Sequence, residues 1–179
     1  MDKKVAILRG INVGGKRKIL MSDLKAMFEK LGFSNITTYI QSGNVVFEST
    51  LENAKLAELI EVSIHDVFGH DVPVIIISYE DLRRTVEFNP FNTNEADINK
   101  LYLTFLKQKP SNENLEIIKA FNHGPDKFQI IELNAFIYCE GKYHESKLTN
   151  VFFEKKLKVG ATTRNWKTVL KLLELSKGN

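Results

Sequence analysis

The residues best suited to binding an anion lie near the N-terminus, in the segment Arg9-Gly-Ile-Asn-Val-Gly-Gly-Lys16. Gly10, Gly15 and Lys16 have the spacing of a P-loop, whose backbone N–H groups and lysine bind phosphates. Arg17 stands where a P-loop has the Ser or Thr that holds Mg²⁺, so we do not expect nucleotide hydrolysis. The glycines leave backbone donors open beside basic side chains, which predicts an anion-binding loop. The alternative is that they only allow a tight turn.

A second polar segment, Gln41-Ser-Gly-Asn44, is predicted to lie beside this loop. It follows a predicted strand over residues 36–40, and the basic segment follows a predicted strand over residues 4–8. In a split β-α-β arrangement these two strands are parallel and end at the same side of the sheet. A plain hairpin turn is the simpler interpretation of the second segment alone. The loop that enters the fourth strand, Gly69-His70-Asp71, is expected to begin at the same edge. We expect polar side chains of these segments to face one cleft with the basic loop: Asn12, Gln41, Ser42, Asn44, His70 and Asp71.

A third segment, Ala161-Thr-Thr-Arg-Asn-Trp166, is predicted to begin the last helix, with Thr162 or Thr163 as its N-cap. Arg164 would then lie in the first helical turn, where the helix dipole disfavours a positive charge. We expect it to reach a ligand anion, or a carboxylate of the other half of the chain. Arg164 and Asn165 would then come within about 10 Å of the basic segment. The alternative is an ordinary cap with a solvated arginine.

The predicted ligand-binding residues are Arg9, Asn12, Gly14, Gly15, Lys16, Gln41, Ser42, Asn44, Arg164 and Asn165. No catalytic residue is assigned and no cofactor is expected. The four histidines lack the spacing of a metal site. A phosphate-containing small molecule is the predicted partner, ahead of nucleic acid, and no membrane partner is expected.

The elements that must position these residues are predicted from apolar periodicity and from cap and turn residues. Residues 1–78 are predicted to form β-α-β-β-α-β. The strands are expected over residues 4–8, 36–40, 45–47 and 72–77, and the helices over 23–31 and 52–68. Ser22 is the predicted cap of the first helix, and Ser78 of a third helix that ends near residue 88.

The second half is predicted to begin the same order again. Strands are expected over residues 100–106, 128–131 and 135–139, and helices over 111–120, 147–157 and 164–175, so that a helix replaces the fourth strand. The sequence therefore predicts an α+β fold of two ferredoxin-like, split β-α-β subdomains packed together. Their bounds are residues 1–89 and 100–179, the latter including the C-terminal helices, with a linker over 90–99. Strands that are apolar at consecutive positions predict that both faces of each sheet are covered.

Composition excludes several classes of protein. The 179 residues are 43% hydrophobic and 26% charged with a net charge of +3, which excludes a disordered chain. No apolar run approaches the roughly 20 residues that span a bilayer, and the first residues do not fit a signal peptide. The single cysteine, Cys139, excludes an internal disulfide, and its apolar strand predicts an inert buried thiol. We expect a cytoplasmic protein.

The basic residues are concentrated at both ends of the chain. Residues 1–18 hold six Lys or Arg and one Asp, and residues 142–179 hold nine Lys or Arg and three Glu. If the two ends meet in space, this distribution favours an anionic partner. A solvated basic face is the alternative.

Three functions agree with these features. The preferred one is binding of a small anionic or nucleotide-like ligand in a cleft formed by segments 9–18, 41–44 and 162–166, and the sequence leaves catalysis open. The alternative is a nucleic-acid-binding or protein-interaction module without catalysis. An RNA-recognition motif needs aromatic residues on its first and third strands, where Phe47 alone is available, so the nucleic-acid interpretation ranks second.

Four segments of the sequence resemble those of a known protein family. They are Val5-Ala-Ile-Leu-Arg-Gly-Ile-Asn-Val-Gly-Gly-Lys16, Leu31-Gly32, Thr38-Tyr-Ile-Gln-Ser-Gly-Asn-Val-Val-Phe47 and Thr163-Arg-Asn-Trp166. Together they resemble the bacterial family known as domain of unknown function 1697, over nearly the whole chain. The resemblance implies a soluble bacterial α+β protein with two ferredoxin-like halves, and it implies no known activity.

Overall fold

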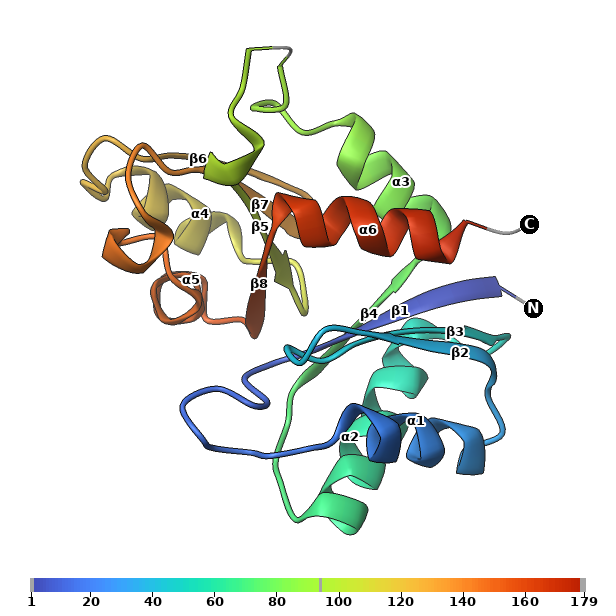
Figure 1. Ribbon diagram of the computed structural model, residues 1–179. Coiled ribbons are helices and arrows are strands. Elements are labelled where there is room, and N and C mark those ends of the chain that lie inside the picture. Colours follow the sequence, from blue (N-terminus) through green and yellow to red (C-terminus); the bar gives the residue numbers. More distant parts are fainter. Residues whose placement is uncertain (1, 94, 178–179) are drawn as a thin grey trace. The chain divides into compact units, whose positions relative to one another are not determined.

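The chain forms two compact units. The computed structural model describes residues 2–93 and 95–177, so position 94 of the predicted linker lies outside the described residues. Unit 1 comprises Met1–Arg84 and Lys171–Asn179, and unit 2 comprises Thr85–Leu170. Each unit contains a four-stranded antiparallel sheet (Figure 1), which confirms the predicted α+β class. The domain boundaries expected at residues 89 and 100 stay a prediction.

The sheet of unit 1 has the strand order β2-β3-β1-β4. Each neighbouring pair is antiparallel, so β3 lies between β1 and β2, as the predicted arrangement requires. The elements are β1 (Asp2–Leu8), α1 (Met21–Lys30), β2 (Ser34–Tyr39), β3 (Asn44–Ser49), α2 (Asn53–Phe68) and β4 (Val74–Ser78), and β4 continues into α3 (Tyr79–Glu87).

The sheet of unit 2 has the corresponding order β6-β7-β5-β8. Its elements are the 3-10 turn η1 (Ile98–Lys100), β5 (Leu101–Leu106), α4 (Asn112–Lys119), β6 (Lys127–Ile131), β7 (Asn134–Tyr138), the 3-10 turn η2 (Tyr143–Glu145), α5 (Asn150–Leu157) and β8 (Ala161–Asn165), and β8 continues into α6 (Trp166–Ser176). The expected absence of a fourth strand is therefore wrong. Residues 161–165 pair with β5 as an edge strand, and the helix begins only at Trp166.

Backbone hydrogen bonds extend the correspondence between the units beyond the strands. The N–H of Leu8 donates to the carbonyl of Gly43 at 2.9 Å, and the N–H of Leu106 donates to the carbonyl of Leu133 at 2.9 Å. The next N–H along the chain donates to the carbonyl just before the fourth strand in both units. Arg9 donates to Pro73 at 2.9 Å, and Lys107 donates to Gly160 at 2.8 Å. Positions in the two sheets can therefore be compared one by one.

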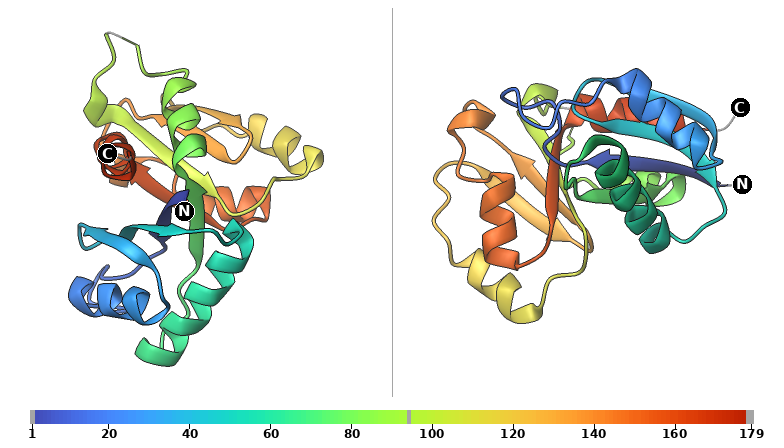
Figure 2. Two further views of the ribbon diagram at one scale, coloured as in Figure 1. Left: turned by 90° about the vertical axis from the view of Figure 1, so that its right-hand side faces the viewer. Right: turned by 90° about the horizontal axis from the view of Figure 1, so that it is seen from below.

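Helices cover one face of each sheet. In unit 1, α1 and α2 lie side by side (Figure 2), and their apolar residues pack on Ala6, Leu8, Val45 and Phe47. In unit 2, residues of α4 and α5 pack on alternate residues of β5 and β7. Val5 to Leu8 are all buried at consecutive positions, which confirms that both faces of β1 are covered.

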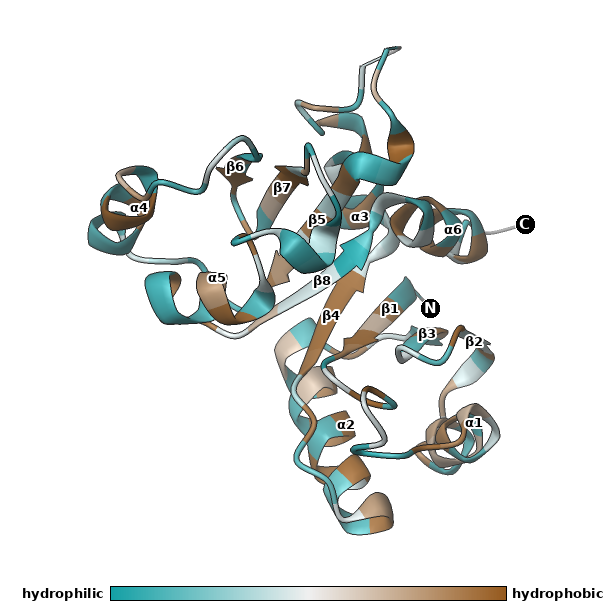
Figure 3. Cartoon of the chain, turned by 60° about the vertical axis from the view of Figure 1, so that its left-hand side comes forward, coloured by the Kyte–Doolittle hydropathy of each residue, from teal (hydrophilic) through white to brown (hydrophobic). Residues whose placement is uncertain are grey.

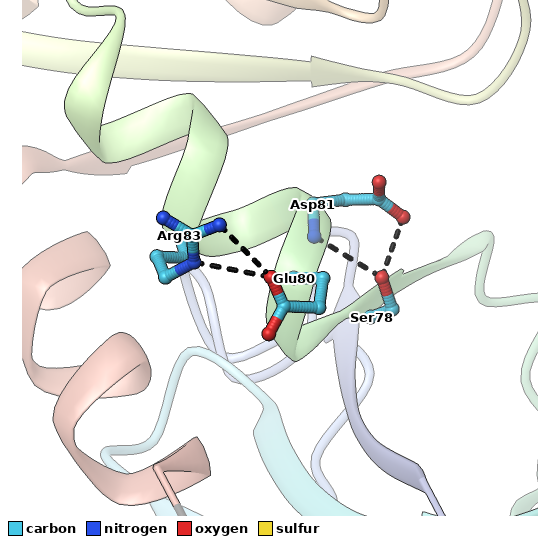
Figure 4. Close-up of polar contacts among 4 residues, drawn as sticks. All are labelled: Ser78, Glu80, Asp81 and Arg83. Atoms are coloured by element: carbon cyan, nitrogen blue, oxygen red, sulfur yellow. Dashed lines mark hydrogen bonds and ion pairs between the residues drawn. The ribbon is translucent and has the colours of Figure 1, made fainter.

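The helix that follows each fourth strand begins with a side-chain cap. The Ser78 hydroxyl accepts the N–H of Asp81 at 3.2 Å and donates to its carboxylate, beside an ion pair between Glu80 and Arg83 (Figure 4). This confirms Ser78 as a cap. At α6 the Asn165 side chain accepts the N–H of Thr168 at 2.8 Å, so Asn165 caps this helix rather than a threonine before it.

The expected cap of α1 is wrong. This helix begins at Met21, its N-cap position is Leu20 without a side-chain hydrogen bond, and Ser22 already lies inside the helix. The Ser22 hydroxyl donates to the neighbouring Asp23 carboxylate instead. The Leu20 side chain is exposed, so it contributes neither a cap nor core packing at the start of the helix.

Candidate functional site

The basic loop, residues 9–20, forms a small hairpin of its own. The N–H of Lys16 donates to the carbonyl of Val13 at 3.1 Å, and between them Gly14 and Gly15 have φ of 58° and 74°. Two consecutive central residues at positive φ are typical of a type I′ turn, which glycine adopts without strain. Ideal Cβ atoms on these two glycines would meet nothing within 4 Å. The glycines thus form a tight turn at an exposed tip, which agrees with the alternative given above for them.

Asn12 joins the basic loop to the β2–β3 turn, residues 40–43. Its side-chain N–H₂ donates to the carbonyls of Ile19 and Gln41, both at 2.9 Å, and its side-chain oxygen accepts the N–H of Ile19 at 2.9 Å. This confirms that the two loops are neighbours. Both amide hydrogens are used within the protein, so Asn12 positions the loops.

Asn44 and Gly43 fix the turn from the other side. The buried Asn44 amide donates to the carbonyl of Tyr39 at 3.0 Å and to the hydroxyl of Ser42 at 3.1 Å. Gly43 has φ of 79°, and a Cβ there would lie 2.7 Å from the Ile11 side chain. Close packing and backbone conformation therefore both require glycine at this position.

Arg9 lies where the basic loop meets the segment before β4, as the strand order predicts. Its N–H donates to the carbonyl of Pro73 at 2.9 Å, and its own carbonyl accepts from the guanidinium of Arg17 at 3.3 Å. In the same segment the Asp71 carboxylate is 2.9 Å from the ring of His65 on α2. Three loops thus meet at one end of the sheet of unit 1, and we call this end the loop end.

The loop end is strongly basic. No acidic residue occurs between Asp2 and Asp23 in the sequence, whereas Arg9, Lys16, Arg17 and Lys18 fall in this interval. Among residues 2–93 and 95–177, the charged groups of Lys16, Arg17 and Lys18 have no ion-pair partner. Like charges this close repel one another, so an anion bound here would be stabilised.

Arg164 and Asn165 belong to unit 2. The expectation that Arg164 lies in the first turn of a helix is wrong, because it lies in β8 opposite Leu103 of β5. The arginine is buried, its guanidinium donates to the carbonyl of Thr163 at 2.9 Å, and burial lowers its pKa to about 10. Thr162 and Thr163 are strand residues and not caps. Proximity of Arg164 and Asn165 to the basic loop stays a prediction.

Unit 2 contains a polar cluster that sequence reasoning missed. The Thr163 hydroxyl donates to the Asn150 side chain at 2.5 Å, so Thr104, 2.7 Å away, must donate to Thr163. The ring of Tyr143 stacks on that of Tyr102, which lies two residues before Thr104 on β5, with centroids 4.4 Å apart. Burial raises the pKa of both tyrosines. The signal for this cluster in the sequence is its two threonines, Thr104 and Thr163, at core positions of two strands.

The fourth strand is mostly apolar in unit 1 and mostly polar in unit 2 (Figure 3). β4 is Val-Ile-Ile-Ile-Ser and hydrophobic along most of its length, whereas β8 is Ala-Thr-Thr-Arg-Asn and paler or hydrophilic. The registers place Ile76 opposite Ala6 in unit 1 and Thr163 opposite Thr104 in unit 2. The polar cluster therefore occupies positions that the same strand order elsewhere fills with apolar side chains.

The single cysteine and the possible metal ligands are the other groups with reactive side chains. Cys139 is buried, as predicted, and burial raises the pKa of its thiol to about 11. In the part of the chain that the structure describes, no three His, Cys, Asp or Glu side chains are grouped to hold a metal ion. Within the same part, no helix is long and apolar enough to cross a membrane.

The comparisons with known proteins give a fold and a family. A solved structure described as the conserved bacterial protein SP0830 from Streptococcus pneumoniae has 24% sequence identity and a TM-score of 0.81, over 98% of this chain and 99% of that chain. At this identity the likeness concerns the fold. No curated protein matches the sequence. One family model, described as protein of unknown function (DUF1697), matches residues 1–136 and so covers all of the loop end, and the chain belongs to this family.

Proposed function

We propose that the loop end of unit 1 binds a phosphate-type anion without a metal ion. The observation that carries the proposal is the group of cations at Lys16, Arg17 and Lys18, which have no ion-pair partner in the described chain. They lie on a loop that Asn12 locks to the β2–β3 turn. Fixed positive charge beside backbone donors favours a phosphate or sulfate.

Comparison with unit 2 supports this proposal. Each of the three connections at the loop end is longer than its counterpart: residues 9–20, 40–43 and 69–73 in unit 1 correspond to 107–111, 132–133 and 158–160 in unit 2. In unit 2 the first connection holds Lys107 and Lys109, and the ammonium group of Lys109 lies 3.5 Å from the carboxylate of Glu132. The same strand order therefore forms with shorter loops in unit 2, so the extra length of the basic loops in unit 1 serves something other than folding.

Within the site we assign two kinds of role. Arg9, Lys16 and Ser42, with the backbone N–H groups of Gly14 and Gly15, are the proposed ligand contacts, and the exposed Gln41 borders them. Asn12 and Asn44 position the loops. Arg17 stands where a P-loop has its metal-binding hydroxyl, so the anion is bound directly.

The experiment is titration calorimetry with inorganic phosphate and with a phosphate monoester, both with and without a chelator. Arg9→Ala and Lys16→Ala should each weaken binding by about 1.5–3 kcal/mol, the scale of a charged hydrogen bond. Lys18→Ala, further from the glycines, should weaken it less, and Lys109→Ala, in the corresponding loop of unit 2, should not change it. Affinity that is indifferent to Arg9→Ala, or that disappears with the chelator, would contradict the proposal.

We also infer that both units follow the ferredoxin-like plan, since the third strand of each unit separates the first from the second. This plan gives the loop end its three converging connections. A bacterial, cytoplasmic setting stays a prediction from composition and from the family resemblance.

A second candidate function is binding of single-stranded nucleic acid by unit 2. Tyr138 favours it, because the ammonium groups of Lys100 and Lys127 lie 5.6 and 5.7 Å from the centre of its ring. A ring with two lysines beside it suits a stacked base and its phosphate. Fluorescence titration with an oligonucleotide at two salt concentrations tests this, and Tyr138→Ala should abolish a salt-sensitive signal.

A further inference from the structure

We propose that the loop end of unit 1 docks on the surface of an anionic lipid membrane, with lipid phosphates as the anions and aliphatic side chains inserted between headgroups. The inference rests on the proposed function and identifies the phosphate as that of a lipid headgroup. It departs from the expectation that no membrane partner exists, which considered only spanning segments. Surface docking needs no segment that crosses the bilayer.

The basis is a group of exposed aliphatic side chains among the cations. Val13 is 64% exposed and Leu20 is 67% exposed, both within the basic loop, and Ile40 of the β2–β3 turn is 46% exposed. Single exposed apolar residues are ordinary on a protein surface. Three of them on two neighbouring loops, together with Lys16 and Lys18, form a mixed apolar and basic surface.

The hydrogen bonds of Asn12 bring these three side chains to one place. Val13 follows Asn12 directly, Leu20 follows Ile19, and Ile40 precedes Gln41. Ile19 and Gln41 are the residues whose carbonyls accept from the Asn12 amide at 2.9 Å. Each exposed residue is therefore the sequence neighbour of a residue in the same junction, so the three residues lie near one another and remain exposed.

The chemistry of this surface favours lipid over other anions. A free phosphate gains nothing from aliphatic neighbours, and nucleic-acid bases stack on aromatic rings. Residues 9–20 and 40–43 contain no aromatic side chain. Aliphatic side chains insert at the level of the headgroups, where lysines near anionic lipids add about 1 kcal/mol each, a factor of about five in affinity.

The test is sedimentation of the full-length protein with vesicles of phosphatidylcholine alone, and of phosphatidylcholine with phosphatidylserine, at about 0.1 M salt. We expect binding only to the anionic vesicles. Lys16→Ala should weaken it about fivefold. The double change Val13→Ser with Leu20→Ser should weaken it at least about tenfold, because less apolar surface is inserted. Leu51→Ser, at a 43% exposed position between β3 and α2 at the opposite end of the sheet, is the matched control and should have no effect.

Calorimetry with inorganic phosphate, run on the same proteins, separates the two proposals. Phosphate binding without vesicle binding would overturn the lipid inference and leave the proposed function intact. Loss of both would overturn both. Vesicle binding that the Val13→Ser and Leu20→Ser pair leaves unchanged would also overturn the inference, because the contact would then be electrostatic only. Circular dichroism of each variant checks that it is folded.

Discussion

Units 1 and 2 have the same strand order but are elaborated in different places. Unit 1 has long loops where β1 and β2 end, and its helix-side core is apolar at Ala6 and Ile76. Unit 2 has short loops there, and its long connection is residues 139–149, between β7 and α5. This connection brings Tyr143 onto Tyr102 beside the threonine pair. The ladder of strands therefore sets the fold, while connections and helix-side positions are free to diverge.

The largest effect is expected where unit 1 packs its β2–β3 turn. In Gly43→Ala, the new Cβ would lie 2.7 Å from Ile11 and 2.8 Å from Leu8 at a φ of 79°. Overpacking and backbone strain together should lower the free energy of unfolding by about 2–4 kcal/mol in urea denaturation followed by circular dichroism. The corresponding position in unit 2 is Leu133, so the requirement for glycine is specific to unit 1.

Gly14→Ala is the control for this change. Its φ is 58° but its Cβ would meet nothing within 4 Å, so it should cost only about 1 kcal/mol. Equal losses for the two variants would mean that strain alone, and not packing between the loops, explains the first.

The core of unit 2 should be sensitive to high pH. Burial raises the pKa of the Cys139 thiol from 9.0 to about 11. Because the unfolded chain loses this proton first, stability should be unaffected below about pH 9 and should fall by about 2–3 kcal/mol as the pH rises to 11. Urea denaturation of the protein and of Cys139→Ala isolates this contribution as their difference. Ser49, the corresponding residue in unit 1, does not titrate in this range, so Ser49→Ala should show a constant difference.

Asn12→Ala removes the junction of the two loops in unit 1. Three hydrogen bonds are lost, and stability should fall by about 1–3 kcal/mol. Hydrogen exchange should accelerate at the Ile19 amide, whose acceptor is the Asn12 side chain. Asn12→Asp keeps that acceptor and loses both donated bonds, so its Ile19 amide should stay better protected than in Asn12→Ala. Identical exchange in the two variants would contradict this assignment.

The smallest effect tests the polar cluster against its apolar counterpart. Thr163→Val leaves the Thr104 hydroxyl and the Asn150 amide without their partner, which should cost about 1–2 kcal/mol. The reciprocal change Ile76→Thr buries a hydroxyl in the apolar core of unit 1 and should also destabilise the protein, by a similar amount. A stabilising Thr163→Val would show that the cluster is kept for a reason other than stability.

Much of the architecture followed from local pattern. The predicted helix over residues 52–68 is α2 to within one residue, and Gly69 ends it in the left-handed conformation because glycine adopts positive φ freely. The apolar runs that become β1, β4 and β5 were also recognisable, since consecutive buried positions need consecutive apolar residues. The neighbouring positions of the two polar loops followed from the order of these elements alone.

The tertiary structure decided what local pattern does not encode. Residues 161–165 have no alternating apolar pattern, and they form β8 because the open edge of β5 supplies their hydrogen-bond partners. The sequence singled out Asn12 and Asn44 as polar, but their partners lie up to 29 residues away, so only the folded chain reveals that they position loops. The exposure of Val13, Leu20 and Ile40 is likewise invisible in the sequence, because burial depends on which distant residues pack against a side chain.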